Sequence, residues 1–220
     1  MSPAPQIYQI KVRLLGISPM VWRRVLIPAS TTLHELHGIL QVAMGWEGIH
    51  LFLFNVHAVS YGSFDLHVSR PDIALQTFEL RERERFSYVY DMGDHWEHEI
   101  RIEKISTLTA GKSYPSCTGG SGACPPEDCG GPHGYLERRD EADCYDAWRD
   151  MDIMADFLED IAVASTPDRA VSDFLSDDVE AAMERMVARA PFIEGTSSRG
   201  QVNKRFRAGN HRQLMHQQMW

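Results

Sequence analysis

The chain has 220 residues, of which 43% are hydrophobic and 10% aromatic, enough to build the core of one sizeable domain. No run approaches the roughly 18–20 apolar residues that a membrane span needs, and residues 1–6 lack the basic and apolar segments of a secretion signal. We therefore expect a cytoplasmic protein without a membrane partner.

The net charge of −9 is unevenly distributed along the chain. Residues 196–220 contain five Lys or Arg and no Asp or Glu, which leaves −14 for residues 1–195. An acidic body disfavours nonspecific contact with nucleic-acid phosphates, so only the C-terminal tail offers such a contact. The apolar pattern lapses in the same tail. These features predict a single domain over residues 1–195 and a basic, disordered tail over residues 196–220.

The N-terminal quarter is predicted to form a hairpin followed by a helix. Apolar and polar residues alternate over Tyr8–Leu14, and Val21–Ile27 forms a second candidate strand. Thr32 and Glu35 have the spacing of a capping box, so a helix is expected to begin here and to end at Gly45. Hairpin followed by helix is a β-grasp-like opening.

Further strands are predicted in the middle of the chain. The expected elements are a buried strand within residues 50–59, a looser segment over 60–72, and a short strand or extended connection over 73–80. Strands 86–90 and 96–105 flank the turn Asp91–Asp94, whose glycine suits a tight hairpin. Alternation in the second of these strands places Trp96 and His98 on its apolar side.

The C-terminal half is predicted to be irregular first and then helical. Residues 111–134 contain seven Gly and four Pro, too many for regular structure. A helix is expected from about Asp140, and a second over residues 176–189. The residues expected to face inward are Tyr145, Trp148, Met151, Ala155, Leu158 and Ala162, then Val179, Ala182, Met183 and Met186. The whole pattern predicts an α+β fold with a mixed or antiparallel sheet and C-terminal helices.

Five segments of unusual composition follow one another along the chain. They are Pro19–Arg24, Thr32–His37, Met44–Trp46 with His50–Leu51, Tyr90–His98 and Tyr114–Tyr135. Together they resemble the plasmid pRiA4b open-reading-frame-three-like family over roughly residues 7–160. The resemblance implies one α+β domain of intracellular type and an association with mobile elements, since members include transposon passenger proteins. It implies no established activity.

Some members of that family are labelled resolvase-like, but the residues of this chain do not support a recombinase. Strand exchange needs a Tyr or Ser nucleophile beside several cations that neutralise the scissile phosphate. The adjacent pair Arg23 and Arg24 lies in a predicted hairpin strand without an evident nucleophile, and no helix-turn-helix is recognisable.

Three cysteines in the Gly/Pro-rich segment suggest a zinc site. Cys117, Cys124 and Cys129 could supply three thiolate ligands from loops, with His98 as the fourth ligand and His50 or His133 as alternatives. The spacing lacks the paired C-x2-C knuckles of common zinc modules. The competing interpretation is that small buried thiols fill a compact loop.

Two acidic motifs predict a polar surface. Asp91 and Asp94 bracket the hairpin turn, while Glu127 and Asp128 follow a Pro-Pro pair. With Trp96 and Tyr135, these residues make up the predicted binding surface. Aspartates also occur in turns simply because their side chains accept hydrogen bonds from local amides, and that alternative stays open.

The favoured function is a binding or adaptor module without catalytic residues, stabilised by zinc and recognising an unidentified protein or nucleic acid. The alternative is a metal-dependent hydrolase acting on nucleic acid, with the four carboxylates and His98 around a divalent ion. Carboxylates that converge in a cleft would favour the hydrolase, and carboxylates that cap local amides would favour the binding module.

Overall fold

The computed structural model describes residues 5–142, 144–163, 170–193 and 198–216. The chain folds into two compact units. The first, here called the sheet unit, comprises residues 1–132 and 195–220, and the second, the helical unit, comprises residues 133–194. This division differs from the single domain expected over residues 1–195, because the tail belongs to the sheet unit and the helices before it do not.

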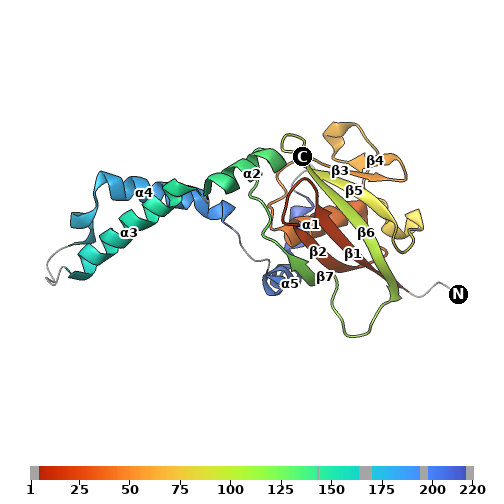
Figure 1. The fold of residues 1–220 in the computed structure, drawn as a ribbon. Helices are drawn as coiled ribbons and strands as arrows, with labels where there is room; N and C mark the ends of the chain where they lie inside the picture. Colours follow the sequence, from red (N-terminus) through yellow and green to blue (C-terminus); the bar gives the residue numbers. More distant parts are fainter. Residues whose placement is uncertain (1–4, 143, 164–169, 194–197, 217–220) are drawn as a thin grey trace. The chain divides into compact units, whose positions relative to one another are not determined.

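The sheet unit is built on seven antiparallel strands in the order β4-β3-β5-β6-β1-β2-β7 (Figure 1). The strands are β1 (Gln6–Leu14), β2 (Trp22–Pro28), β3 (Phe52–Val56), β4 (Val59–Gly62), β5 (Arg85–Tyr90), β6 (Trp96–Thr107) and β7 (Ser116–Ser121). The sheet and its helices confirm the predicted α+β class. Both predicted hairpins, β1–β2 and β5–β6, are present.

The strands bury one side of the sheet and leave the other side partly open, as their alternating burial shows. Ion pairs lie on the open side, among them those that join Glu99 to Arg13 and Arg85, and Glu103 to Arg24. This arrangement is typical of an antiparallel sheet with one solvated face.

Helix α1 (Leu33–Met44) covers the buried side of the sheet, and its ends follow from the sequence. The capping box between Thr32 and Glu35 is formed, and Gly45 ends the helix with a φ of 103°, which favours glycine. Eleven of the twelve residues of α1 are buried. A helix buried on nearly all sides must be covered by more than the sheet.

The C-terminal tail provides that cover, so the prediction of a disordered tail is wrong for its described part, residues 198–216. Helices α5 (Arg199–Arg207) and α6 (Asn210–Leu214) pack against α1 and bury Val202, Phe206 and Leu214. These three apolar residues are too few to show a helical periodicity in the sequence. The helices form because tertiary packing stabilises them, as it does most short helices.

A single polar side chain attaches α5 to the edge strand β7. The Asn203 side chain donates to the Cys117 carbonyl oxygen and accepts from the Cys117 N–H, both at 2.8 Å. The carboxamide thus pairs with the strand as a neighbouring peptide group would, and it satisfies an otherwise open sheet edge.

Two local predictions were wrong. Residues 116–121 form β7 within the segment expected to be irregular, because pairing with β2 satisfies its backbone despite Gly119 and Gly120. The segment 73–80 contains a 3-10 helix, η2 (Leu75–Phe78), rather than a short strand or an extended connection. The looser segment before it contains η1 (Phe64–Leu66).

The helical unit contains α3 (Tyr145–Val163), η3 (Val171–Phe174), α4 (Asp177–Arg189) and η4 (Ala190–Phe192). It also contains α2 (Gly131–Ala142) except for the first two residues of that helix, which belong to the sheet unit. The two predicted helices are present, but the inward face expected for α3 is wrong. Tyr145 and Trp148 are 82% and 62% exposed, and α3 buries Asp150 and Phe157 instead. Asp150 turns inward because Arg185 and Arg189 of α4 donate hydrogen bonds to its carboxylate.

In the described ranges, no helix has both the length and the apolar character needed to cross a membrane.

We expect the substitution Gly38→Ala to destabilise the protein. A Cβ at this position of α1 would lie 2.1 Å from the carbonyl oxygen of His211, so α6 would have to move away. Overpacking of this kind costs about 1–3 kcal/mol, more than the gain in helix propensity. Urea unfolding of the two proteins measures the difference.

Gly200→Ala is the matched control, since a Cβ there would meet only the Ser198 Oγ at 3.7 Å, an ordinary contact. We expect this second substitution to be neutral or to stabilise by up to about 1 kcal/mol. Equal effects of the two substitutions would contradict the docking of α6 on α1.

We expect the contribution of Asp150 to stability to disappear in acid. Hydrogen bonds from Arg185 and Arg189 lower the pKa of Asp150 to about 2 in the folded protein, below the value of about 3.9 in an unfolded chain. The stabilisation is therefore complete above about pH 4 and is lost as the pH falls through about 2. Thermal unfolding of the wild type and Asp150→Asn, followed by circular dichroism from pH 7 to 2.5, should show a difference that narrows toward the acid end.

The exposed Asp156 of the same helix supplies the control Asp156→Asn. A difference between Asp150→Asn and the wild type that stays constant over this pH range would refute the ion-pair interpretation.

Candidate functional site

A buried polar core lies between α1 and the sheet. The Tyr88 hydroxyl accepts a hydrogen bond from Gln41 Nε2 at 2.8 Å and lies 2.8 Å from His37 Nδ1. His98 is fully buried beside it, with Nδ1 3.3 Å from the Tyr88 carbonyl oxygen and its ring edge-on to Trp46. Burial lowers the pKa of His98 to about 4 and that of His37 to about 3, so both rings are neutral near pH 7.

Among the described residues, no three of the predicted zinc ligands place their ligand atoms within 4.8 Å of one another. Cys117 lies in β7, where its thiol donates to the Gly119 carbonyl oxygen at 3.4 Å, and His98 lies in the buried core. Burial raises the pKa of the Cys117 and Cys124 thiols in the metal-free chain. With Cys129 also buried, the geometry supports thiols that fill a compact structure more than it supports this ligand set.

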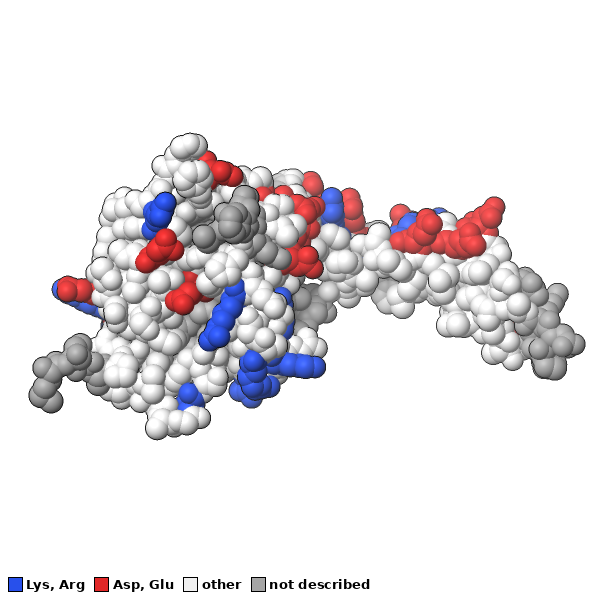
Figure 2. Space-filling view, turned by 180° about the vertical axis from the view of Figure 1, so that it is seen from behind, with Lys and Arg blue, Asp and Glu red and all other residues white. Residues whose placement is uncertain are grey.

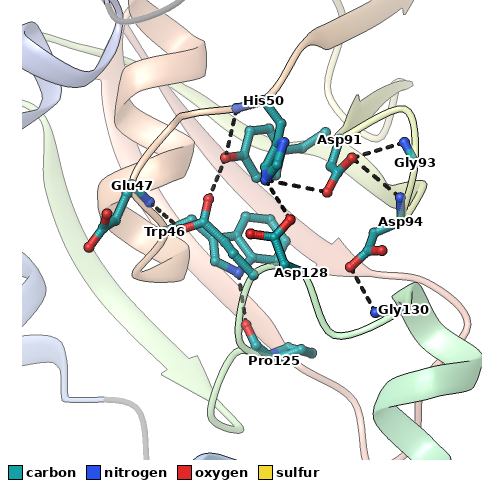
Figure 3. A network of polar contacts seen from close by, with 11 residues as sticks. Trp46, Glu47, His50, Asp91, Gly93, Asp94, Pro125, Asp128 and Gly130 are labelled. Atoms are coloured by element: carbon teal, nitrogen blue, oxygen red, sulfur yellow. Dashed lines mark hydrogen bonds and ion pairs between the residues drawn. The ribbon is translucent and has the colours of Figure 1, made fainter.

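A different set of ligand atoms does converge. Among the residues that the structure describes, one group of three His, Cys, Asp or Glu places a ligand atom of each within 4.8 Å of the others, and it consists of His50, Asp91 and Asp128. His50 Nε2 lies 3.1 Å from an Asp128 oxygen and 3.6 Å from an Asp91 oxygen (Figure 3). His50 precedes β3, Asp91 follows β5, and Asp128 belongs to the loop before α2.

Asp91 is oriented by its own turn. Its Oδ1 accepts hydrogen bonds from the backbone N–H of Gly93 at 2.9 Å and of Asp94 at 3.3 Å, which leaves Oδ2 to face His50 (Figure 3). The φ of Asp91 is 61°, in the left-handed region that Asp tolerates better than most residues. One oxygen therefore caps local amides and the other belongs to the converging group.

The loop that carries Asp128 is held in place on three sides. Glu127 accepts a hydrogen bond from the Tyr90 hydroxyl and a second one, at 2.9 Å, from the Glu47 N–H. The Trp46 indole N–H donates to the Pro125 carbonyl oxygen at 2.8 Å (Figure 3). This loop thus has a fixed position relative to the end of α1 and to β5.

Asp94 fixes the same loop from the hairpin turn, because its Oδ2 accepts from the Gly130 N–H at 3.1 Å. The approach is close, since a Cβ on Gly131 would lie 2.2 Å from the Asp94 carbonyl oxygen. Gly131 also has a φ of 68°, so glycine is required here on both counts. Asp94 and Glu127 therefore position the group rather than join it.

Two members of the predicted binding surface, Trp96 and Tyr135, do not belong to the converging group. Trp96 is fully buried in the core and offers no surface, because its strand turns the indole toward Trp46. Tyr135 belongs to the helical unit, where it packs against Phe192.

Arg23 has a structural place as well. This side chain is 3% exposed, and it donates hydrogen bonds to the carbonyl oxygens of Ala43, Trp22 and Ser121. It thereby ties the end of α1 to β2 and to the end of β7. A guanidinium used in this way cannot bind the scissile phosphate of a recombinase substrate.

Sequence reasoning missed His50 as a central residue and considered it only as a substitute zinc ligand. It precedes β3 by two positions, and the sequence does not show that β3 pairs with β5. The proximity of His50 to Asp91 follows from that pairing alone.

The comparisons with known proteins agree with the fold and do not name an activity. The chain is 38% identical over 137 residues to the uncharacterized protein y4hQ of Sinorhizobium fredii (strain NBRC 101917 / NGR234), and this covers 60% of the chain and 70% of the relative. A crystal structure of the protein of unknown function MM3350 from Methanosarcina mazei Go1 matches with a TM-score of 0.60 and 32% identity, covering 64% of this chain and 84% of that one.

The family model of the plasmid pRiA4b ORF-3-like protein matches residues 6–156, which include β1, the polar core and all three residues of the converging group. The chain belongs to the plasmid pRiA4b ORF-3-like family.

Proposed function

We propose that this protein is a binding module whose recognition site is built on a divalent cation held by His50, Asp91 and Asp128. The observation that carries the proposal is the convergence of these three side chains, with ligand atoms within 4.8 Å of one another. Each comes from a different segment of the sheet unit, and the Asp91 turn and the Asp128 loop are each held by hydrogen bonds of their own.

The electrostatics of the group favour a cation. Asp91 is 7% exposed, and buried carboxylates are normally paired or coordinated to a metal. No Lys or Arg forms an ion pair with Asp91 or Asp128 in the described ranges, and the basic group that faces them is His50. A divalent ion would balance both carboxylates at once.

The position of the His50 side chain also favours a bound cation. Its Nε2 is shielded from solvent and faces both carboxylates, 3.1 Å from an Asp128 oxygen and 3.6 Å from an Asp91 oxygen. An imidazole nitrogen in this position is able to coordinate a metal ion that the two carboxylates share. Imidazole combined with carboxylates suits zinc, manganese or iron better than calcium or magnesium, which prefer oxygen alone.

A metal-dependent hydrolase acting on nucleic acid is the second candidate, and one observation favours it. Three protein ligands leave coordination positions open, and the Asp128 side chain is 68% exposed, so a metal-bound water could reach a substrate. The other carboxylates, Asp94 and Glu127, are engaged by amide and phenol donors and do not supply a free general base. The binding module is therefore the better supported of the two.

We expect the metal-free protein to bind close to one equivalent of Mn²⁺, Co²⁺ or Zn²⁺ in a calorimetric titration. His50→Gln and Asp128→Asn should each weaken this binding by more than about tenfold, because each removes one ligand. Asn tolerates the φ of 56° at position 128, so the backbone is not strained by the change. Asp65→Asn, at an exposed aspartate of η1, is the control and should bind as the wild type does.

The same proteins separate the two candidate functions. Cleavage of a single-stranded oligonucleotide by the metal-loaded wild type, lost in His50→Gln, would replace the binding module by the hydrolase. Metal affinity that is unchanged in both ligand variants would overturn the site itself.

We expect Tyr90→Phe to weaken metal binding about three- to tenfold without removing a ligand atom, since the phenol oxygen that is lost accepts a hydrogen bond from the His50 backbone N–H, at 3.4 Å, and donates to Glu127. The phenol holds Glu127, and Glu127 fixes the loop that presents Asp128. Tyr61→Phe is the control, because Tyr61 on β4 contacts Phe78 through its ring. Hydrogen exchange of residues 122–131 should rise in the first variant only. Identical exchange in both variants would show that Glu127 does not depend on the phenol.

A further inference from the structure

A second polar feature of the sheet unit is a groove beside the edge strand β7. It has a volume of about 440 Å³ and lies between α5 and the segment 112–118. The residues that matter for its chemistry are Lys112, Ser113, Ser116, Arg199, Asn203 and Arg207. A groove of this volume is within the range of small-molecule sites, roughly 300–1,000 Å³.

The docked tail creates the groove. Arg199, Asn203 and Arg207 are spaced four residues apart and so share one face of α5. The two hydrogen bonds between Asn203 and Cys117 hold that face against β7 and place one arginine on each side of the contact. Lys112 adds a third cation from the segment before the strand.

These three cations are uncompensated within the described part of the chain. Lys112, Arg199 and Arg207 take part in none of its ion pairs, unlike Arg13, Arg24 and Arg85 on the open side of the sheet. Figure 2 shows Lys and Arg side chains gathered over the tail helices of the sheet unit. Arginine guanidinium groups and serine hydroxyls are donors that commonly bind phosphate oxygens.

We propose that this groove binds the phosphate group of a small phosphorylated ligand. A small ligand fits better than a nucleic-acid strand for two reasons. Among the described residues, the lining contains no aromatic side chain on which a base could stack, and nucleic-acid binding usually rests on many more phosphate contacts than three cations provide. The site shares no residue with the His50–Asp91–Asp128 group, so either proposal can fail without the other.

Isothermal titration of the metal-free, full-length protein with inorganic pyrophosphate at low salt tests the groove. Arg207→Gln and Arg199→Gln should each weaken pyrophosphate binding about tenfold or more. Lys204→Gln is the matched control, because it removes a cation from the same helix outside the groove, and it should leave the affinity within about twofold. Thermal melts check that the variants are folded, and Arg207→Gln carries the test if Arg199→Gln melts early.

A second arm compares pyrophosphate with ADP and with a twelve-nucleotide single strand. Similar affinities for pyrophosphate and ADP would show that the phosphates alone are recognised, and tighter ADP binding would show that a nucleoside is recognised as well; both support the proposal. Binding of the oligonucleotide that is tighter than that of both small ligands and is lost in Arg207→Gln would overturn the small-ligand assignment. Absence of pyrophosphate binding, or equal losses in Lys204→Gln and Arg207→Gln, would overturn the groove.

Discussion

The pairing of β3 with β5, in which Phe52 lies opposite Tyr90, is the constraint on which the candidate site depends. Because the strands are antiparallel, the residue just before β3 comes to lie beside the residue just after β5. The backbone bond from the Asp91 N–H to the Leu51 carbonyl oxygen, at 2.9 Å, extends the ladder to that point. His50 and Asp91 therefore become neighbours although 40 residues separate them in the sequence.

The polar core fixes the same corner from inside the fold. His37 stacks on Phe52 with ring centroids 3.9 Å apart, while Gln41 donates to the Tyr88 hydroxyl. These contacts set α1 against β3 and β5, and Gly45 then turns the chain so that Trp46 can reach Pro125. The position of the Asp128 loop is thus a consequence of how α1 is packed, which is why groups that never touch the site help to build it.

The sequence predicts well the elements whose stability is local. The β1–β2 and β5–β6 hairpins and α1 carry alternation, turn residues and caps of their own, and all three form as expected. The prediction of the buried face of α3 was wrong because it assumed that the most apolar side of the helix would be buried. In the structure a carboxylate, Asp150, takes the inner position, since two arginines of α4 neutralise it there.

The elements that the sequence does not reveal are those stabilised by distant partners. β7 contains two adjacent glycines, and its backbone is held by β2 on one side and by Asn203 on the other. The tail has few apolar residues, and its helices exist because α1 offers them a surface. Of the site, the sequence predicts the acidic motifs but not their partner His50, because strand order determines which residues meet.

The same edge of the sheet unit connects the two polar features. The segment from Lys112 to Asp128 begins at the cationic groove, runs through β7 and ends at the carboxylate group. Its strand is held by Asn203 near the start and by the buried Arg23 at Ser121.

The basic residues of the tail act differently when they are docked in this way than they would on a disordered segment. Dispersed charges would give the acidic body only a weak, salt-sensitive attraction for anions, whereas cations fixed beside β7 provide a defined local site. The overall charge of −9 therefore argues against binding a long polyanion but not against a phosphate held at one point.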